Sequence, residues 1–153
     1  MEKLELVFSD NQQLREPSEH INEITSKLIQ LAEDMKVAMV KYNGIGLAAP
    51  QVGHNIRLIV VRIGDEVYEM FNPQIRSHSG GFITLEEGCL SIPNEYCMVP
   101  RYETIKLKFQ DKTSKYNYWE IKGLDARVVQ HEVDHLDGIL ITDLVKENDQ
   151  HPV

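Results

Sequence analysis

The sequence predicts an α+β fold in which small, mostly antiparallel sheets pack around a central helix that carries two histidines. Three observations predict it. One long amphipathic helix lies in the first third of the chain, segments of alternating apolar and polar residues follow, and a second amphipathic helix comes near the end. The order helix, strands, helix favours α+β over an alternating α/β arrangement.

The first helix is expected to begin at Ile21, after a wrapping segment over residues 1–20. Its apolar positions recur at intervals of three and four residues, which is the spacing of one helical face. Asn43-Gly44 predicts its end. The apolar positions are Ile21, Ile24, Leu28, Leu31, Met35, Ala38 and Tyr42.

The middle of the chain predicts strands. Residues 56–63, "IRLIVVRI", are rich in β-branched side chains, and the turn "GDE" leads into a second strand at 67–71. Residues 77–81, "SHSGG", are expected to form a loop. Residues 104–109 and 116–121 alternate in polarity around polar "QDKTSK", which predicts a hairpin.

The last helix is expected from about Leu124 to Leu136, with Gly138 as its stop. The tail at 146–153, "KENDQHPV", has little to bury and is expected to be mobile. The length of 153 residues, without a repeat or linker, predicts a single domain over residues 1–153.

Composition limits the classes of function. The chain is 42% hydrophobic and 26% charged, and its net charge of −8 argues against binding to nucleic acid. Residues 101–127 carry a local net charge of +3, which we interpret as a solvated strand face. No apolar run would span a bilayer, and the N-terminus resembles no export signal. With two cysteines, we expect free thiols and a reducing, cytoplasmic location.

The segment "VVQHEVDHLDG" (128–138) carries the clearest chemical pattern. On a helix, His131 and His135 lie one turn apart on the same face and can bind one cation, with Glu132 beside them as a base. Two histidines that are only hydrogen-bonded in the core would give the same five-residue pattern. The motif alone leaves both readings open.

A catalytic metal needs a third protein ligand, with water in the fourth position. The pattern of metzincin proteases continues to a third histidine, but Ile141 stands there. A thermolysin-like glutamate has only Glu147 as a candidate, too close to the helix. Cys89, in "EEGCLSIP", remains as a thiolate that would complete a Cys-His-His set. For Cys97 we expect only a small buried side chain.

Three motifs occur in an order and separation that resemble peptide deformylases: "GIGLAAPQ" (44–51), "EGCLS" (87–91) and "QHEVDH" (130–135). The resemblance extends from about Leu4 to Leu144. It implies a metal-dependent hydrolase that removes the N-formyl group from N-formylmethionyl nascent peptides and releases formate.

The resemblance also implies roles for individual residues. Cys89, His131 and His135 would bind one divalent metal with water as fourth ligand, and Glu132 would act as general base and then acid. The Gln51 side chain and the Leu90 backbone N–H would donate to the oxyanion.

For substrate binding, the backbone near Ile45 and Gly46 is expected to pair with the peptide as an added strand. An apolar pocket for the methionine side chain is expected from Ile45, Leu85, Leu124 and Val128. Arg127 either lines this pocket or points to solvent.

Behind the ligands we expect support from charged residues. Glu87 and Arg101 would form an ion pair behind the Cys89 segment. Asp134 would orient a ligand through a second contact, or is simply a surface charge.

The resemblance implies Fe²⁺ in the native state, with Zn²⁺ as the alternative that the ligand types also suit. It implies contact with the ribosome, but the longer C-terminal extension through which some members dock is absent, so that mode of docking is in doubt. No direct contact with nucleic acid or membrane is expected. Two other functions would use the same helix: a zinc endopeptidase, and a metal-binding domain without turnover. Glu132 argues against the latter, because a purely structural site has no use for a base.

Overall fold

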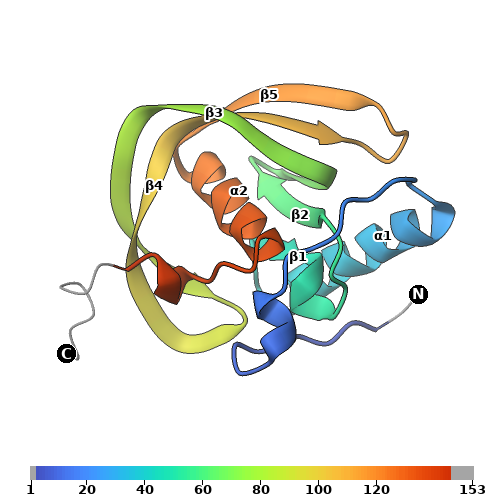
Figure 1. The fold of residues 1–153 in the computed structure, drawn as a ribbon, viewed down its shortest axis with the longest axis horizontal. Helices are drawn as coiled ribbons and strands as arrows, with labels where there is room; N and C mark the ends of the chain where they lie inside the picture. The colour runs from blue at the N-terminus through green and yellow to red at the C-terminus, as the bar shows by residue number, and fades with distance from the viewer. Residues whose placement is uncertain (1–2, 146–153) are drawn as a thin grey trace.

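The structure, a computed structural model, describes residues 3–145 and contains one five-stranded antiparallel sheet and two α-helices in that range (Figure 1). The strands, each paired with the next, are β1 (Gly46–Ala48), β2 (Leu58–Ile63), β3 (Glu66–Cys89), β4 (Ile92–Gln110) and β5 (Tyr116–Lys122). The helices are α1 (Ser26–Lys41) and α2 (Gly123–Leu136), with short 3-10 helices η1 (Gln12–Arg15), η2 (Ala49–Val52) and η3 (Ile141–Asp143). The predicted α+β class is confirmed, with one continuous sheet in place of several small ones.

Strand β2 lies at the centre of the fold because both of its faces are buried. Leu58 and Val60 pack in the core that includes α1, whereas Ile59 and Val61 pack in the core that includes α2. A strand covered on both faces is a continuous apolar run rather than an alternating one, as "LIVV" is. The two helices therefore cover opposite sides of this part of the sheet (Figure 1).

The long strands β3 and β4 curve together around α2 (Figure 1). The predicted loop at 77–81 is wrong, because these residues lie inside β3 and pair with β4. Gly80 and Gly81 adopt positive φ angles of 80° and 69°, and the register shifts between Ser79 and Phe82. The glycines thus form an irregularity that bends the hairpin instead of ending a strand.

Helix α1 begins five residues later than predicted. The Thr25 side chain caps it by accepting a hydrogen bond from the Leu28 N–H (3.3 Å). Ile21 is buried as expected, but its backbone N–H and C=O are both bound by the Asn72 side chain of β3, each at 2.8 Å. The chain ahead of α1 is therefore tied to the sheet and continues the apolar face without being helical.

The other boundaries agree with prediction to different degrees. Asn43, at φ 59°, ends the α1 segment as expected, and the hairpin of β4 and β5 is present around 111–115. Strand β4, however, begins at Ile92 rather than near 104. Gly138 follows α2 with φ 74°, and a Cβ there would lie 2.3 Å from the Arg15 carbonyl oxygen. The tail prediction at 146–153 lies outside the described residues.

None of the helices in the described range has the length and apolar character that a membrane span requires.

Candidate metal centre and active site

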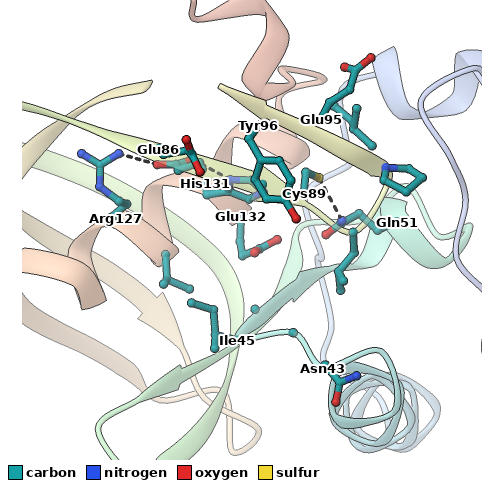
Figure 2. Close-up of a pocket in the computed structure, with 18 of the residues that line it drawn as sticks. Asn43, Ile45, Gln51, Glu86, Cys89, Glu95, Tyr96, Arg127, His131 and Glu132 are labelled. Atoms are coloured by element: carbon teal, nitrogen blue, oxygen red, sulfur yellow. Dashed lines mark hydrogen bonds and ion pairs between the residues drawn. The ribbon is translucent and has the colours of Figure 1, made fainter. Parts of the chain in front are cut away.

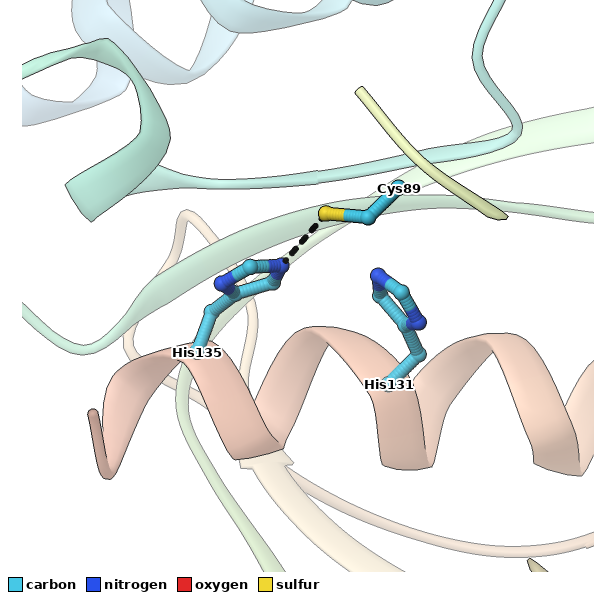
Figure 3. A group of neighbouring side chains, drawn as sticks. All are labelled: Cys89, His131 and His135. Carbon is cyan, nitrogen blue, oxygen red and sulfur yellow. Dashed lines mark hydrogen bonds between the residues drawn. The ribbon is translucent and has the colours of Figure 1, made fainter. Parts of the chain in front are cut away.

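Three potential ligands converge from two elements. Cys89 ends β3, and His131 and His135 lie one turn apart on α2 (Figure 3). Their ligand atoms all lie within 4.8 Å of one another, and the Cys89 Sγ lies 3.3 Å from the His135 Nε2. Among residues 3–145 this is the one group of three or more such side chains.

The donor set fits a small divalent ion. A thiolate and an imidazole on one tetrahedral zinc are expected to lie about 3.6 Å apart, close to the observed sulfur–nitrogen distance. The described histidines outside α2 (His20, His54 and His78) are not part of the group. Three protein ligands leave one coordination position for water, as in catalytic rather than structural sites. His151 lies outside the described residues.

Glu87 orients the first histidine. Its Oε1 accepts a hydrogen bond from the His131 Nδ1 (2.9 Å), which leaves the His131 Nε2 free to face an ion. Burial alone would raise the pKa of the Glu87 carboxyl, but hydrogen bonds from His131 and Arg101 outweigh it and lower that pKa to about 2. Glu87 is therefore an ionised acceptor at neutral pH.

The predicted pair between Glu87 and Arg101 is confirmed, with nitrogen–oxygen distances of 3.0 and 2.9 Å. Arg101 also binds Asp134 on α2. Asp134 thus contacts the guanidinium behind Glu87 rather than a ligand directly. Burial raises the pKa of the Asp134 carboxyl, and the positive charge of Arg101 opposes that shift.

The two imidazoles have different charge environments in the absence of an ion. Burial lowers the pKa of His135, and the positive charges of His131 and Arg101 lower it further, so His135 is neutral. Burial also opposes a charge on His131, but Glu132 and Cys89 outweigh it and raise its pKa. Binding of a metal ion to the Cys89, His131 and His135 group must therefore displace a proton.

Glu132 is buried without a compensating contact. The residue is only 5% exposed, and its Oε1 has no hydrogen-bond partner among the described residues. Burial raises the pKa of the carboxyl to about 7, although the positive charges of His131 and Arg101 partly offset this effect. Gly46 makes room for it, because a Cβ there would lie 2.5 Å from the Glu132 Oε2.

Gln51 is fixed with its amide facing the sulfur (Figure 2). It is 2% exposed in η2, and its Oε1 accepts from the Ala48 backbone N–H (2.9 Å). Its Nε2 then donates to the Ser91 Oγ (3.2 Å) and lies 3.8 Å from the Cys89 Sγ. Leu90 stands beside this group, in the turn that joins Cys89 to Ile92.

A cleft of about 620 Å³ opens over these residues. The segment 43–46 lines one side, and residues 86–90 and 92–96 of the β3–β4 hairpin line the other (Figure 2). Leu85 is not among the lining residues and is 40% exposed on β3. The predicted site residues that line the cleft are Ile45, Gly46, Gln51, Cys89, Leu90, Leu124, Val128, His131 and Glu132.

Two residues of the site had no assigned place in the sequence analysis. Ser91 is fully buried, accepts a hydrogen bond from the Gln51 Nε2 and is the last residue of the "EGCLS" motif. Arg127, left between pocket and solvent, is buried and bound to Glu87 (2.6 Å). Its position four residues before His131 places it on the ligand face of α2, and this spacing was the signal that could have found it.

Comparison with known proteins agrees with the geometry. A family model described as "Polypeptide deformylase" matches residues 3–151. A peptide deformylase of Caldicellulosiruptor bescii is 45% identical over 132 residues, which cover 86% of this chain and 79% of that one. Peptide deformylase 1 of Bacillus anthracis is 42% identical over 147 residues, covering 95% and 94%.

The fold is similar to that of a solved relative. The crystal structure of the Thermotoga maritima peptide deformylase superposes with a TM-score of 0.92 at 34% identity, covering 95% of this chain and 99% of that one. The match of the family model over nearly the whole length, together with these identities, shows that the chain belongs to the polypeptide deformylase family.

Proposed function

We propose that this protein removes the formyl group from N-formylmethionyl peptides by hydrolysis and releases formate. The observation that supports it most is the buried Glu132 carboxyl, whose Oε1 has no hydrogen-bond partner, in a cleft beside the Cys89, His131 and His135 group. A buried carboxylate without a partner destabilises a fold, so its presence beside three metal ligands favours a chemical role.

Cys89, His131 and His135 would hold one divalent ion, which supplies Lewis acidity to a water molecule and to the formyl oxygen. Glu132 takes the proton from the attacking water and then delivers it to the nitrogen of the leaving amine. Its carboxyl lies in the cleft beside the three ligands, where it can accept that proton and return it.

Charge that develops on the formyl oxygen needs donors already in place. The Gln51 amide is held by the Ala48 N–H and by Ser91, so it needs no rearrangement to donate. The Leu90 backbone N–H is proposed as the second donor. Losing one such donor costs about 100- to 1,000-fold in rate.

The substrate backbone would lie along β1. This strand is at the edge of the sheet, so one row of its backbone groups faces the cleft side without a neighbouring strand. An extended peptide can pair there near Ile45 and Gly46. The methionine side chain would enter between Leu124 and Val128, while Leu85 flanks the pocket from outside its lining.

Iron as Fe²⁺ is proposed as the native ion, one per chain, with Zn²⁺ as the alternative. Both suit a thiolate with two imidazoles, and the ligands do not select between them. The two free cysteines favour a reducing compartment, and we place the protein in the cytoplasm as one catalytic domain. Its partners would be N-formylmethionyl nascent chains.

The test is formate release from a short N-formylmethionyl peptide. Protein loaded anaerobically with Fe²⁺ is compared with zinc-loaded protein, metal-free protein and the Glu132→Ala variant. The N-acetyl form of the same peptide serves as a control for general amide hydrolysis.

The proposal predicts turnover that needs both the ion and Glu132, and that discriminates strongly against the acetyl peptide. No formate from any metal form, with one ion bound per chain, contradicts it and favours a binding domain without turnover. Cleavage at an internal peptide bond would instead favour an endopeptidase.

A further inference from the structure

We propose that Arg127 is a positioning residue for the metal centre: it holds Glu87, and through Glu87 the imidazole of His131, in place between α2 and the β3–β4 hairpin. This inference rests on the proposed metal-binding role of Cys89, His131 and His135. It concerns a residue that touches neither the ion nor a ligand.

The contacts of Arg127 span three elements. From α2, its guanidinium donates to the Glu87 Oε2 on β3 (2.6 Å) and to the Val99 carbonyl oxygen on β4 (2.9 Å). It also donates to the Ile83 carbonyl oxygen on β3. Arg127 is only 8% exposed, so these contacts are sheltered from water. Charge-assisted hydrogen bonds are strongest in such a sheltered environment.

Glu87 connects these contacts to the ligands. One of its oxygens accepts from His131 and Arg101, and the other accepts from Arg101 and Arg127. Each oxygen of Glu87 therefore accepts two hydrogen bonds, and the carboxylate cannot turn without breaking a bond to a charged donor. Glu87 is also two residues before Cys89 on the same strand, so fixing it fixes the approach of the thiol.

Charge balance separates the roles of the two arginines. Arg101 is shared between Glu87 and Asp134, whereas Glu87 is the one carboxylate among the described residues that binds Arg127. The charges of Arg101, Arg127, Glu87 and Asp134, two positive and two negative, sum to zero. Without Arg127, the Glu87 Oε2 loses one of its two charged donors, and Glu87 is free to move toward Arg101 and away from the geometry that holds His131.

The test compares two variants with a matched control. Arg127→Met keeps the length of the side chain and removes every donor, whereas Arg127→Lys keeps the charge but cannot reach all three acceptors. The control is Arg57→Met. Arg57 also joins α2 to the sheet by binding a carboxylate, Asp137 (2.9 Å), and a carbonyl, that of Leu136 (3.3 Å), but it has no contact with Glu87.

Zinc affinity is measured by competition with a chromogenic chelator, and the ring N–H proton of His131 is followed by NMR in the zinc-loaded protein. We expect Arg127→Met to weaken zinc binding about 10-fold, the lower end of the effect of removing a partner of a ligand. Arg127→Lys should show a smaller loss, and the His131 proton signal should shift in both. Arg57→Met should keep the wild-type affinity and signal even if its unfolding temperature falls.

The inference is overturned if both Arg127 variants keep the wild-type zinc affinity and an unchanged His131 signal. If Arg127→Met does not fold, the same result in Arg127→Lys alone overturns it. An equal loss of affinity in Arg57→Met also overturns it, because the effect would then be general to the packing of α2. Wild-type protein that binds zinc but releases no formate contradicts the proposed function and leaves this inference intact.

Discussion

The two helices have similar lengths, 16 and 14 residues, but they bury different kinds of side chain. Both pack against the sheet, on opposite faces of β2. The buried residues of α1 are apolar except for Asp34, namely Leu31, Ala32, Asp34, Met35, Ala38 and Met39. Those of α2 include four polar or charged ones, Arg127, Gln130, Glu132 and His135.

This difference between the buried side chains of α1 and α2 shows which helix stabilises the fold and which one includes destabilising groups. Burial of the apolar face of α1 stabilises the protein directly. On α2 most of the polar groups have partners, such as Gln130, which binds both backbone groups of Tyr102 (3.0 and 2.8 Å). Two atoms of α2 are exceptions, since the Glu132 Oε1 and the His135 Nδ1 are buried without a hydrogen-bond partner. That cost is understandable if the carboxylate is needed for chemistry.

Glu132→Gln gives the sharpest form of this contrast. We expect kcat to fall about 100- to 10,000-fold, the usual contribution of a general base. The folded-state pKa of about 7 lies above the ordinary value of 4.5 for this side chain, so ionisation opposes folding increasingly as pH rises from about 4.5 to 7. Metal-free Glu132→Gln should therefore be at least as stable as wild type at pH 8, by urea unfolding.

The matched control is Glu23→Gln, which removes an exposed carboxylate ahead of α1. It should change neither activity nor stability by a measurable amount. Full activity in Glu132→Gln, or a large loss of its stability at pH 8, would remove the distinction between the two helices.

Met35→Ala tests the opposite helix. Met35 is fully buried in α1, and its truncation should lower the free energy of unfolding by about 2–5 kcal/mol. Activity per folded molecule should stay at the wild-type level, because Met35 is not among the residues that line the cleft. Val37→Ala, at a position 50% exposed on the same helix, should change stability by about 0.5 kcal/mol or less. A loss of activity without a loss of stability in Met35→Ala would contradict this assignment.

Glu87→Gln tests the paired charges behind α2 by their pH dependence. The folded-state pKa of about 2 lies below the ordinary value of 4.5 for this side chain, so the stabilisation is complete above pH 4.5 and is lost as pH falls toward 2. The shift corresponds to roughly 3 kcal/mol. The stability difference between metal-free wild type and Glu87→Gln should therefore shrink from pH 6 to pH 3, measured by urea unfolding. A difference that is constant across this window would mean that Glu87 is not held as an anion.

Thr25→Ala should have the smallest effect. It removes the cap of α1 and should cost about 1 kcal/mol of unfolding free energy, with no change in activity. Thr25→Ser, which keeps the hydroxyl, is the control. Equal stability of Thr25→Ala and wild type would place the true start of the helix elsewhere.

The sequence predicted the fold class and most elements because their periodicity is local. The end of α1 at Asn43 and the hairpin around 111–115 depend on neighbouring residues only. The start of α1 did not follow from periodicity, since Asn72, far along the chain, binds the backbone of Ile21. The "SHSGG" segment likewise needed its partner strand to be recognised as part of β3.

For the site, spacing and motifs identified the group of Cys89, His131 and His135, which the fold brings together. They could not assign Arg127, because its choice between pocket and solvent depends on how closely β3 and β4 curve over α2. Leu85, which the sequence analysis expects in the methionine pocket, is not among the residues that line the cleft, and its role stays a prediction. Side-chain direction on a bent strand is set by tertiary structure.

The central claim is that α2 and the end of β3 form one metal centre from Cys89, His131 and His135. The most direct test is anaerobic titration of metal-free protein with Co²⁺, followed by absorption spectroscopy, for wild type and Cys89→Ser. The account predicts one ion per wild-type chain with a tetrahedral spectrum and a thiolate charge-transfer band, and loss of that band in Cys89→Ser. An octahedral spectrum, or a band unchanged by Cys89→Ser, would contradict it.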